Sequence, residues 1–382
     1  MQRILYVGSD LPDKSASGLR VFYNSLAIKE YGFDVDVLSF ERNITKKEQI
    51  VYKNIRIIRI PYPVSKKGFI KYLFSPKTIK DTIDEYGPYD CVICYELPSF
   101  SFRKLYRECK KKNIKLICDS AEWHTANHLH GIAKIMKKID VFFSMHLLYK
   151  KCDGMIVISD FLLKHFNHKN IILIPPLQEH YNIEKVQNKN KRVFIYAGSP
   201  GADKDNLPMI ISAFNKIDFD YELHIFGIDY ISYTHKMAKN QSLSLEKRMK
   251  EKKIVFHGYV DRNLILEQYK KTDFSIIVRN PTRRNNAGFP TKFCESICCL
   301  TPVICNDFSD LKKYVKENSF GLLIKNLCDD EVYKTFLDAI KLKDDDIKEL
   351  IINCEKTNLF DYRYYINSLG LFIDNTINGG SK

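Results

Sequence analysis

The chain has 382 residues, too many for one ordinary hydrophobic core, so two domains are expected. Hydrophobic residues make up 45% and charged residues 28%, a normal globular composition that excludes a low-complexity chain. Sixty Lys and Arg residues against 46 Asp and Glu residues give a net charge of +14. Residues 1–185 hold 30 of the basic and 20 of the acidic residues, hence +10 of that charge. Such a surface favours anionic partners: nucleic acid, nucleotide sugars or an anionic membrane face.

The first half of the chain alternates between strand and helix patterns. The β-branched run at 3–10 predicts a buried parallel strand, residues 17–33 have helical spacing closed by Gly32, and 34–40 alternates as a second strand. This order makes a right-handed βαβ unit. Further strands are predicted at 55–61, 91–96, 115–120, 154–160 and 171–176. The first half is therefore predicted to be a doubly wound α/β domain.

The polar stretch 177–192 lacks periodicity and is predicted to link two domains. The alternation then resumes, which predicts a second doubly wound sheet. Its strands are expected at 193–199, 221–228, 253–260, 274–280, 302–307 and 321–325, and its helices at 206–217, 262–272 and 291–300. The predicted division is residues 1–180, residues 181–355, and a C-terminal helix at 356–382 that packs back on the first domain.

The eleven cysteines have no disulfide-framework spacing. Cys91 and Cys94 form one CxxC pair inside a predicted buried strand, and without a second pair a zinc site is not expected. Free thiols in this number suggest a reducing compartment. The N-terminus does not resemble a signal peptide, and no run of 18 apolar residues occurs, so a cytoplasmic location is expected.

Residues 131–153 permit two interpretations. Lys134, Lys137 and Lys138 alternate with large apolar residues at helical spacing. A basic amphipathic helix of this kind can lie on an anionic membrane. A helix packed on the core with solvated lysines is the simpler interpretation and is preferred from the sequence.

Three segments carry candidate ligand-binding residues. The turn after the first strand leads through Gly18 into a helix, where backbone N–H groups attract phosphate, although a purely structural turn is equally consistent. The loop after 193–199 contains Ser199 and places Lys204 at a helix start, where the helix dipole disfavours a cation. An anion such as a diphosphate between Lys204 and the helix would resolve that conflict; a solvated lysine is the alternative.

The third segment, 280–304, joins a strand end to a helix. The strand ends at Arg279, and Lys292 and Glu295 lie on the helix that follows. A carboxylate beside phosphates is suited to accept hydrogen bonds from a ribose diol. The alternative for Glu295 is a partner for the positive end of the helix dipole. Backbone N–H groups at Gly288, Phe289 and Thr291 are expected to meet the diphosphate or sugar hydroxyls.

The stretch GFPTKFCESICCLTPVI resembles the donor-site signature of retaining GT-B glycosyltransferases of family four, and the resemblance extends over nearly the whole chain. It implies two Rossmann-like domains facing a cleft, and metal-independent transfer of a sugar from a nucleotide-diphosphate donor, with no cofactor. Positive side chains would replace the metal in stabilising the leaving diphosphate. The resemblance implies roles for Gly18 beside the diphosphate, Lys204 on phosphate, Glu295 on ribose, and Tyr259 and Val260 at the base.

Three departures from the family pattern stand out. Ala287 occupies the position of the usual first glutamate, and Ser199 that of a frequent arginine, for which Arg279 could substitute. In the first domain no histidine is cleanly placed. Asp119 and Glu122 follow a strand, and His124, with His128 nearby, is the histidine chosen as a catalytic candidate; a structural histidine is the alternative.

The function predicted from the sequence is synthesis of a surface polysaccharide such as capsule or O-antigen. The acceptor would be a glycan or a lipid-linked glycan, with peripheral contact to the anionic inner membrane face suggested by the basic first half. A nucleotide-sugar epimerase or hydrolase of the same architecture is the alternative. A nucleic-acid-binding protein ranks lower, because no element combines a basic stripe with interleaved aromatic residues.

Overall fold

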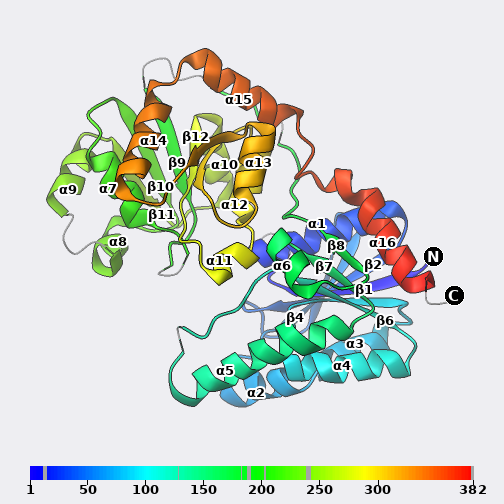
Figure 1. Ribbon diagram of the computed structural model, residues 1–382. Coiled ribbons are helices and arrows are strands. Elements are labelled where there is room, and N and C mark those ends of the chain that lie inside the picture. Colours follow the sequence, from blue (N-terminus) through cyan, green and yellow to red (C-terminus); the bar gives the residue numbers. More distant parts are fainter. Residues whose placement is uncertain are drawn as a thin grey trace. The chain divides into compact units, whose positions relative to one another are not determined.

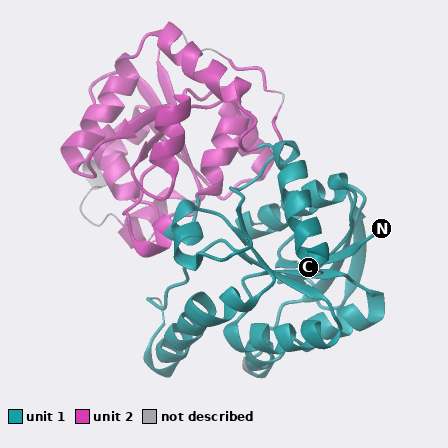
Figure 2. Ribbon diagram, turned by 45° about the vertical axis from the view of Figure 1, so that its right-hand side comes forward, with its two compact units in different colours: residues 1–178, 287–289, 361–382 teal, residues 179–286, 290–360 magenta. Residues whose placement is uncertain are grey.

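The computed structural model divides the chain into two compact units, coloured separately in Figure 2. Unit 1 comprises residues 1–178, 287–289 and 361–382, and unit 2 comprises residues 179–286 and 290–360. The C-terminal segment from Asp361 thus belongs to unit 1. The residues that the structure describes are 1–11, 15–127, 129–181, 183–186, 191–201, 204–237 and 242–379.

Unit 1 is built on an eight-stranded sheet with the strand order β3-β4-β2-β1-β5-β6-β7-β8 (Figure 1). All neighbouring strands are parallel except the β3–β4 hairpin, whose exposed first strand the sequence analysis did not predict. The central strands are buried on both faces, as their continuous apolar runs require. The strands are β1 (Arg3–Ser9), β2 (Asp34–Glu41), β3 (Glu48–Tyr52), β4 (Ile55–Pro61), β5 (Cys91–Tyr95), β6 (Lys115–Ser120), β7 (Gly154–Val157) and β8 (Ile171–Leu173).

Helices cover this sheet. Ser15 caps the first helix by accepting a hydrogen bond from Gly18 N–H, and Gly32 ends it with φ 124°. The last helix, α16, packs on α1 so closely that a Cβ on Gly370 would lie 2.0 Å from the Tyr31 ring. The α-helices are α1 (Ala16–Tyr31), α2 (Lys66–Phe74), α3 (Lys77–Tyr86), α4 (Ser99–Lys111), α5 (Gly131–Phe143), α6 (Asp160–Phe166) and α16 (Ile366–Asn378).

Unit 2 is built on a six-stranded, fully parallel sheet with the order β11-β10-β9-β12-β13-β14. Its strands are β9 (Arg192–Ala197), β10 (Tyr221–Phe226), β11 (Ile254–Gly258), β12 (Phe274–Ile277), β13 (Val303–Asn306) and β14 (Gly321–Ile324). Its helices are α7 (Leu207–Asn215), α8 (Tyr230–Met237), α9 (Ser242–Lys250), α10 (Arg262–Lys270), α11 (Arg283–Ala287), α12 (Thr291–Cys298), α13 (Leu311–Asn318), α14 (Asp329–Lys341) and α15 (Asp344–Lys356). The two doubly wound α/β domains predicted from the sequence are confirmed.

Each sheet has its own hydrophobic core, and two local predictions can be judged against them. Cys91 and Cys94 are fully buried in β5, as expected of a structural strand. The core-packed interpretation of 131–153 is wrong for α5, because that helix has no buried residue. Among the described helices, none is long and apolar enough to cross a membrane.

Candidate functional site

The site in unit 2 forms where β9 and β12 lie next to each other. Chain order reverses there, because β9 has β10 on one side and β12 on the other. Ligands of doubly wound sheets bind outside the carboxyl ends of the strands at such a point. The loop after β9 is tied to the end of β12, since Asn206 N–H donates to the Val278 carbonyl at 2.8 Å. This link places Lys204 and Asp205 beside Arg279.

Asp205 holds two of the predicted basic residues together. Its Oδ1 accepts a hydrogen bond from Arg279 Nε at 2.5 Å, and its Oδ2 accepts one from Lys292 Nζ at 2.7 Å. The Tyr196 hydroxyl also donates to Oδ2, at 2.8 Å. The Asp205 side chain is 2% exposed. The sequence analysis proposed Arg279 and Lys292 but missed Asp205, which joins residues 74 and 87 positions away.

Burial and charge act on these groups in opposite senses. Burial alone would raise the pKa of the Asp205 carboxyl, but Lys292 and Arg279 outweigh it and hold that pKa well below its usual range. Burial lowers the pKa of the Lys292 ammonium to about 8, against the attraction of Asp205. The positive charges of Arg279 and, less strongly, of Lys204 add to that lowering of the pKa. Three cations around one carboxylate leave a positive site that favours an anion.

Lys204 and Ser199 occupy the loop between β9 and α7. In the described part of the chain, the Lys204 ammonium makes no hydrogen bond or ion pair, and Ser199 is exposed. Gly227, at the end of β10, lets this loop pass, because a Cβ there would lie 2.5 Å from the Gly198 carbonyl oxygen. Gly227 has φ 91°, which also favours glycine. Sequence reasoning missed it because one glycine after a strand has no distinctive local pattern.

Glu295 is oriented by an arginine that the sequence analysis did not propose. Arg262, at the start of α10, donates from Nε and Nη2 to Glu295 Oε1 at 3.0 and 2.8 Å. Its Nη2 also donates to the Tyr181 hydroxyl at 2.9 Å. Within the described residues no hydrogen bond reaches Oε2, which leaves that oxygen for a ligand. Glu295 is the fifth residue of α12, beyond the first turn, so the helix-dipole interpretation is weak.

The predicted base-recognition segment follows β11. Gly258 has φ 68°, and its carbonyl accepts a hydrogen bond from Gly227 N–H at 2.7 Å. Tyr259 is 76% exposed, whereas Val260 packs against the small cluster that includes Phe226. An exposed aromatic ring at this position is available for stacking on a base.

The turn before α12 divides between the units. Ala287, Gly288 and Phe289 belong to unit 1, and Thr291 opens α12 in unit 2. Ala287 is fully buried and Phe289 nearly so. Ala287 therefore presents a buried methyl group at the position where the sequence resemblance implied the first glutamate of the donor-site signature.

Asp119 is not placed to contact a substrate, which corrects its assignment as a catalytic candidate. It is fully buried, and Arg20 grips it with Nε and Nη2 at 2.9 and 2.7 Å from Oδ1. The Tyr6 hydroxyl donates to its Oδ2 at 2.6 Å. Arg20 also donates to the Ile174 carbonyl at 2.8 Å. This buried network connects α1, β1, β6 and the end of β8, so Asp119 helps to hold these elements together.

His124 and Glu122 remain together beside a third group, Glu96. His124 Nε2 lies 2.8 Å from Glu96 Oε2, and its Nδ1 lies 3.9 Å from Glu122 Oε2. Glu96 follows β5 with φ 47° and is fixed because Oε1 accepts the N–H groups of Ala121 and Glu122 at 2.8 and 2.6 Å. The charge of Glu96 raises the pKa of the His124 imidazole above 6.5, although burial opposes the shift. His128 lies outside the described residues.

The His124–Glu96 pair is expected to make the free energy of unfolding depend on pH. Because the pKa of His124 is raised in the folded state, its stabilising contribution is fully present below pH 6.5 and is lost as pH rises through the raised pKa. We expect His124→Gln to flatten this part of the stability–pH curve. Urea unfolding followed by fluorescence measures it, because the chain's single tryptophan, Trp123, lies in unit 1.

The exposed His130 provides the matched control, and His130→Gln should leave the curve unchanged. A His124→Gln variant with the wild-type slope above pH 6.5 would contradict the assigned pairing.

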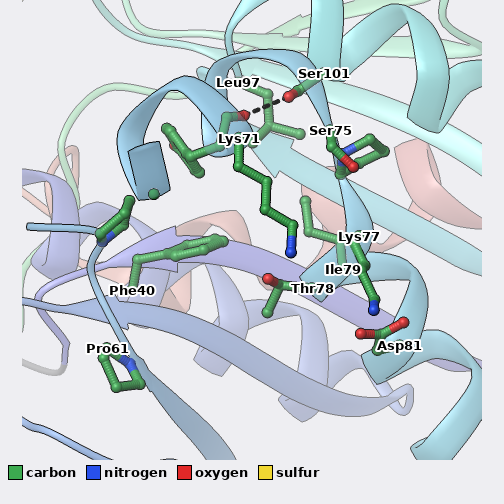
Figure 3. A pocket seen from close by; sticks show the side chains of 14 residues that line it. Phe40, Pro61, Lys71, Ser75, Lys77, Thr78, Ile79, Asp81, Leu97 and Ser101 are labelled. Atoms are coloured by element: carbon green, nitrogen blue, oxygen red, sulfur yellow. Dashed lines mark hydrogen bonds between the residues drawn. The ribbon is translucent and has the colours of Figure 1, made fainter. Parts of the chain in front are cut away.

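Two neighbouring pockets open in unit 1, and this group lines one of them. One, of about 200 Å³, is lined by Glu96, Glu122 and His124 together with residues of α2 and α5. The other, of about 310 Å³, has Lys71 running through it towards Thr78 (Figure 3). Tyr72 and Leu97 line both pockets. The first pocket offers acid–base groups, and the second is lined by Lys71, Lys77 and Asp81.

The close packing of the turn explains the glycine at position 18 without a ligand. A Cβ there would lie 2.2 Å from the Asp10 carbonyl oxygen, so only glycine fits this turn. Across the described residues, no group of three or more His, Cys, Asp or Glu side chains is arranged to hold a metal ion.

Comparison with known proteins agrees with the site in unit 2. Residues 178–356 match the family model described as Glycosyl transferases group 1. The match spans 179 of the 382 residues. The matched range includes Asp205, Arg262, Lys292 and Glu295, and the protein is therefore a glycosyltransferase. Among curated proteins, none matches the sequence significantly.

Solved glycosyltransferase structures match the whole chain. Sucrose-phosphate synthase from Thermosynechococcus elongatus has a TM-score of 0.72 at 14% identity, covering 99% of this chain and all of its own. The catalytic domain of starch synthase IV from Arabidopsis thaliana, bound to ADP and acarbose, has a TM-score of 0.72 at 8% identity, covering 98% and 99%. WaaG, involved in lipopolysaccharide biosynthesis, has a TM-score of 0.65 at 13% identity, covering 99% and 100%. These similarities confirm the predicted GT-B fold of the glycosyltransferase.

Proposed function

We propose that this glycosyltransferase moves a sugar from a nucleoside-diphosphate donor to a glycan or lipid-linked acceptor, with retention at the anomeric carbon and without a metal ion. Surface polysaccharide synthesis at the cytoplasmic face of the inner membrane is the proposed setting. The likeness to WaaG, a glycosyltransferase involved in lipopolysaccharide biosynthesis, is consistent with that setting.

The observation that carries the proposal is the cationic cluster in unit 2. Arg279 and Lys292 pair with the single carboxylate of Asp205 at the switch point of the sheet, and Lys204 precedes Asp205 in the chain. A diphosphate leaving group develops negative charge as the sugar departs, and preorganised cations stabilise that charge without reorganisation. The cluster can thus take the part that a divalent metal takes in other transferases.

Glu295 is proposed to bind the ribose of the donor. Arg262 occupies its Oε1 and fixes the carboxylate plane, while Oε2 can accept a hydrogen bond from a ribose hydroxyl. The exposed ring of Tyr259 is proposed to stack on the base, beside Val260. Starch synthase IV was solved with bound ADP, which makes a nucleoside diphosphate a reasonable first probe.

The acceptor is proposed to bind unit 1 at the pocket lined by His124, Glu96 and Glu122. A hydrogen-bonded imidazole and carboxylates can orient acceptor hydroxyls and exchange protons with them. If His124→Ala retained the full kcat, His124 would be removed from the proposed site.

A thermal-shift panel of nucleoside diphosphates and nucleotide sugars tests the proposal. A ligand at 100 times its Kd should raise stability by about 2.7 kcal/mol, because it binds only the folded state. We expect Glu295→Gln to weaken binding of the best ligand by roughly 1.5–3 kcal/mol, since a charged hydrogen bond to ribose is lost.

The exposed Glu317 on α13 supplies a matched control, and Glu317→Gln should bind as the wild type does. No shift with any nucleotide would reject the proposed donor.

The alternative is a nucleotide-sugar epimerase or hydrolase of the same fold, which would also bind the donor. Labelled donor distinguishes the two, because a transferase forms product only when an acceptor is added. A nucleic-acid-binding function, which ranks lower, would require steeply salt-dependent binding to random DNA.

A further inference from the structure

Helix α5 carries its large apolar side chains on the face that is exposed to solvent. Ile132 is 77% exposed, Ile135 59% and Phe142 55%, and the remaining members of this apolar stripe are Met136, Ile139 and Phe143. Their positions fall at i, i+3, i+4, i+7, i+10 and i+11, which is one face of a helix. Soluble proteins seldom leave such a stripe open, so it indicates a binding surface.

The opposite face of α5 contacts the rest of unit 1. Asp140 accepts a hydrogen bond from Ser99 N–H at 2.7 Å, which joins α5 to the start of α4, and it pairs with Lys137 at 3.0 Å. Val141, Ser144 and Met145 line the pocket beneath. Asp140 and Lys137 are therefore already partnered, and rotation of α5 to hide its stripe would break these contacts.

The surroundings of the stripe are strongly basic. Residues 131–151 carry five lysines and one acidic residue, Asp140, which pairs with Lys137, while α2 carries three lysines and no acidic residue. Both segments line one pocket, so α2 and α5 are neighbours (Figure 1). On α2, Phe69 and Ile70 are also exposed, beside the exposed Lys67 and Lys71.

We propose that this α2–α5 surface docks unit 1 on an anionic lipid bilayer, with the apolar stripe of α5 at the level of the acyl chains and the lysines at the headgroups. An interfacial helix combines one apolar face with flanking cations in this way. A second copy of the chain is the weaker occupant, because a two-fold interface would bring the same lysines of both copies together.

The two docked helices also line the His124 pocket. Phe69 and Tyr72 of α2 and Val141 of α5 line that pocket together with His124. Docking would therefore keep this pocket near an acceptor that is anchored in the bilayer. Only this consequence rests on the proposed function; docking itself rests on the surface, and its test needs no activity.

Co-sedimentation of the whole protein with vesicles tests the docking. We expect binding to vesicles that contain phosphatidylglycerol, little binding to pure phosphatidylcholine, and weakening with added salt. Ile135→Ser with Ile139→Ser should weaken the partition coefficient at least about tenfold, because apolar area no longer enters the bilayer. Lys138→Glu should weaken it by more than about fivefold, since a headgroup attraction becomes a repulsion.

Exposed residues of unit 2 provide matched controls: Ile231→Ser with Leu264→Ser for the apolar change, and Lys250→Glu for the charge change. These should bind as the wild type does. Three results would overturn the inference: no binding to phosphatidylglycerol vesicles, equal binding by the α5 variants, or lipid-free dimers that the α5 variants convert to monomers. Donor binding in the thermal-shift panel is independent of all three.

Discussion

Lys292→Met is expected to lower kcat about 100- to 1,000-fold, the usual loss when one preorganised stabiliser of transition-state charge is removed. The Lys292 ammonium lies 2.7 Å from Asp205 and is 10% exposed, so water replaces it poorly. Methionine retains most of the side-chain volume but not the charge. Initial-rate kinetics with the donor found in the thermal-shift panel would measure the loss.

The control for this change is Lys316→Met, an exposed lysine on α13 of the same unit. It should leave kcat unchanged. Far-UV circular dichroism checks that both variants are folded. Lys292→Met is expected to fold, because Arg279 still pairs with Asp205 when Lys292 is lost. A Lys292→Met enzyme within about threefold of wild-type kcat would contradict the role of the cluster, since one lost stabiliser costs far more.

Asp119→Leu is expected to destabilise unit 1 by about 3–5 kcal/mol, because it leaves the Arg20 guanidinium buried without a counter-charge. The two side chains are 2% and 0% exposed, and Tyr6 loses its acceptor as well. The double variant Arg20→Met with Asp119→Leu should recover most of the loss, because no uncompensated charge remains. Urea unfolding monitored by Trp123 fluorescence reports on unit 1 alone.

A surface pair in the same unit sets the scale. Asp84 pairs with Lys112 at 2.6 Å, but both side chains are about half exposed. Asp84→Ala should therefore change stability by only about 0–1 kcal/mol. If Asp119→Leu changed the stability of unit 1 as little as Asp84→Ala, the buried network would not stabilise unit 1 as its geometry indicates.

The pattern of apolar and polar residues along the sequence was sufficient to predict the layered α/β architecture. Strands such as β5 and β12 are short apolar runs, and helices such as α1 have a capping serine and a closing glycine, so local sequence states both their type and their order. A strand–helix alternation can then form parallel sheets with right-handed crossovers, which leaves few topologies. The exposed β3 was missed because half-polar edge strands lack that signal.

The candidate site was only partly predictable. Lys204, Arg279, Lys292 and Glu295 could be proposed because each lies at a strand end or a helix start, where doubly wound sheets bind ligands. Their partners could not. Asp205 serves as the shared counter-ion, and Arg262 meets Glu295 across 33 residues of sequence.

Sequence by itself determined that the chain folds into two doubly wound domains, that basic residues gather at the strand ends of the second, and that 131–143 is amphipathic. Tertiary structure alone decided that Asp119 is buried against Arg20, that Glu96 holds His124, and that the apolar face of α5 points outward. The physical reason is the same in each case. Periodicity defines which residues share a face or follow a strand, but burial and pairing depend on segments that come from distant parts of the chain.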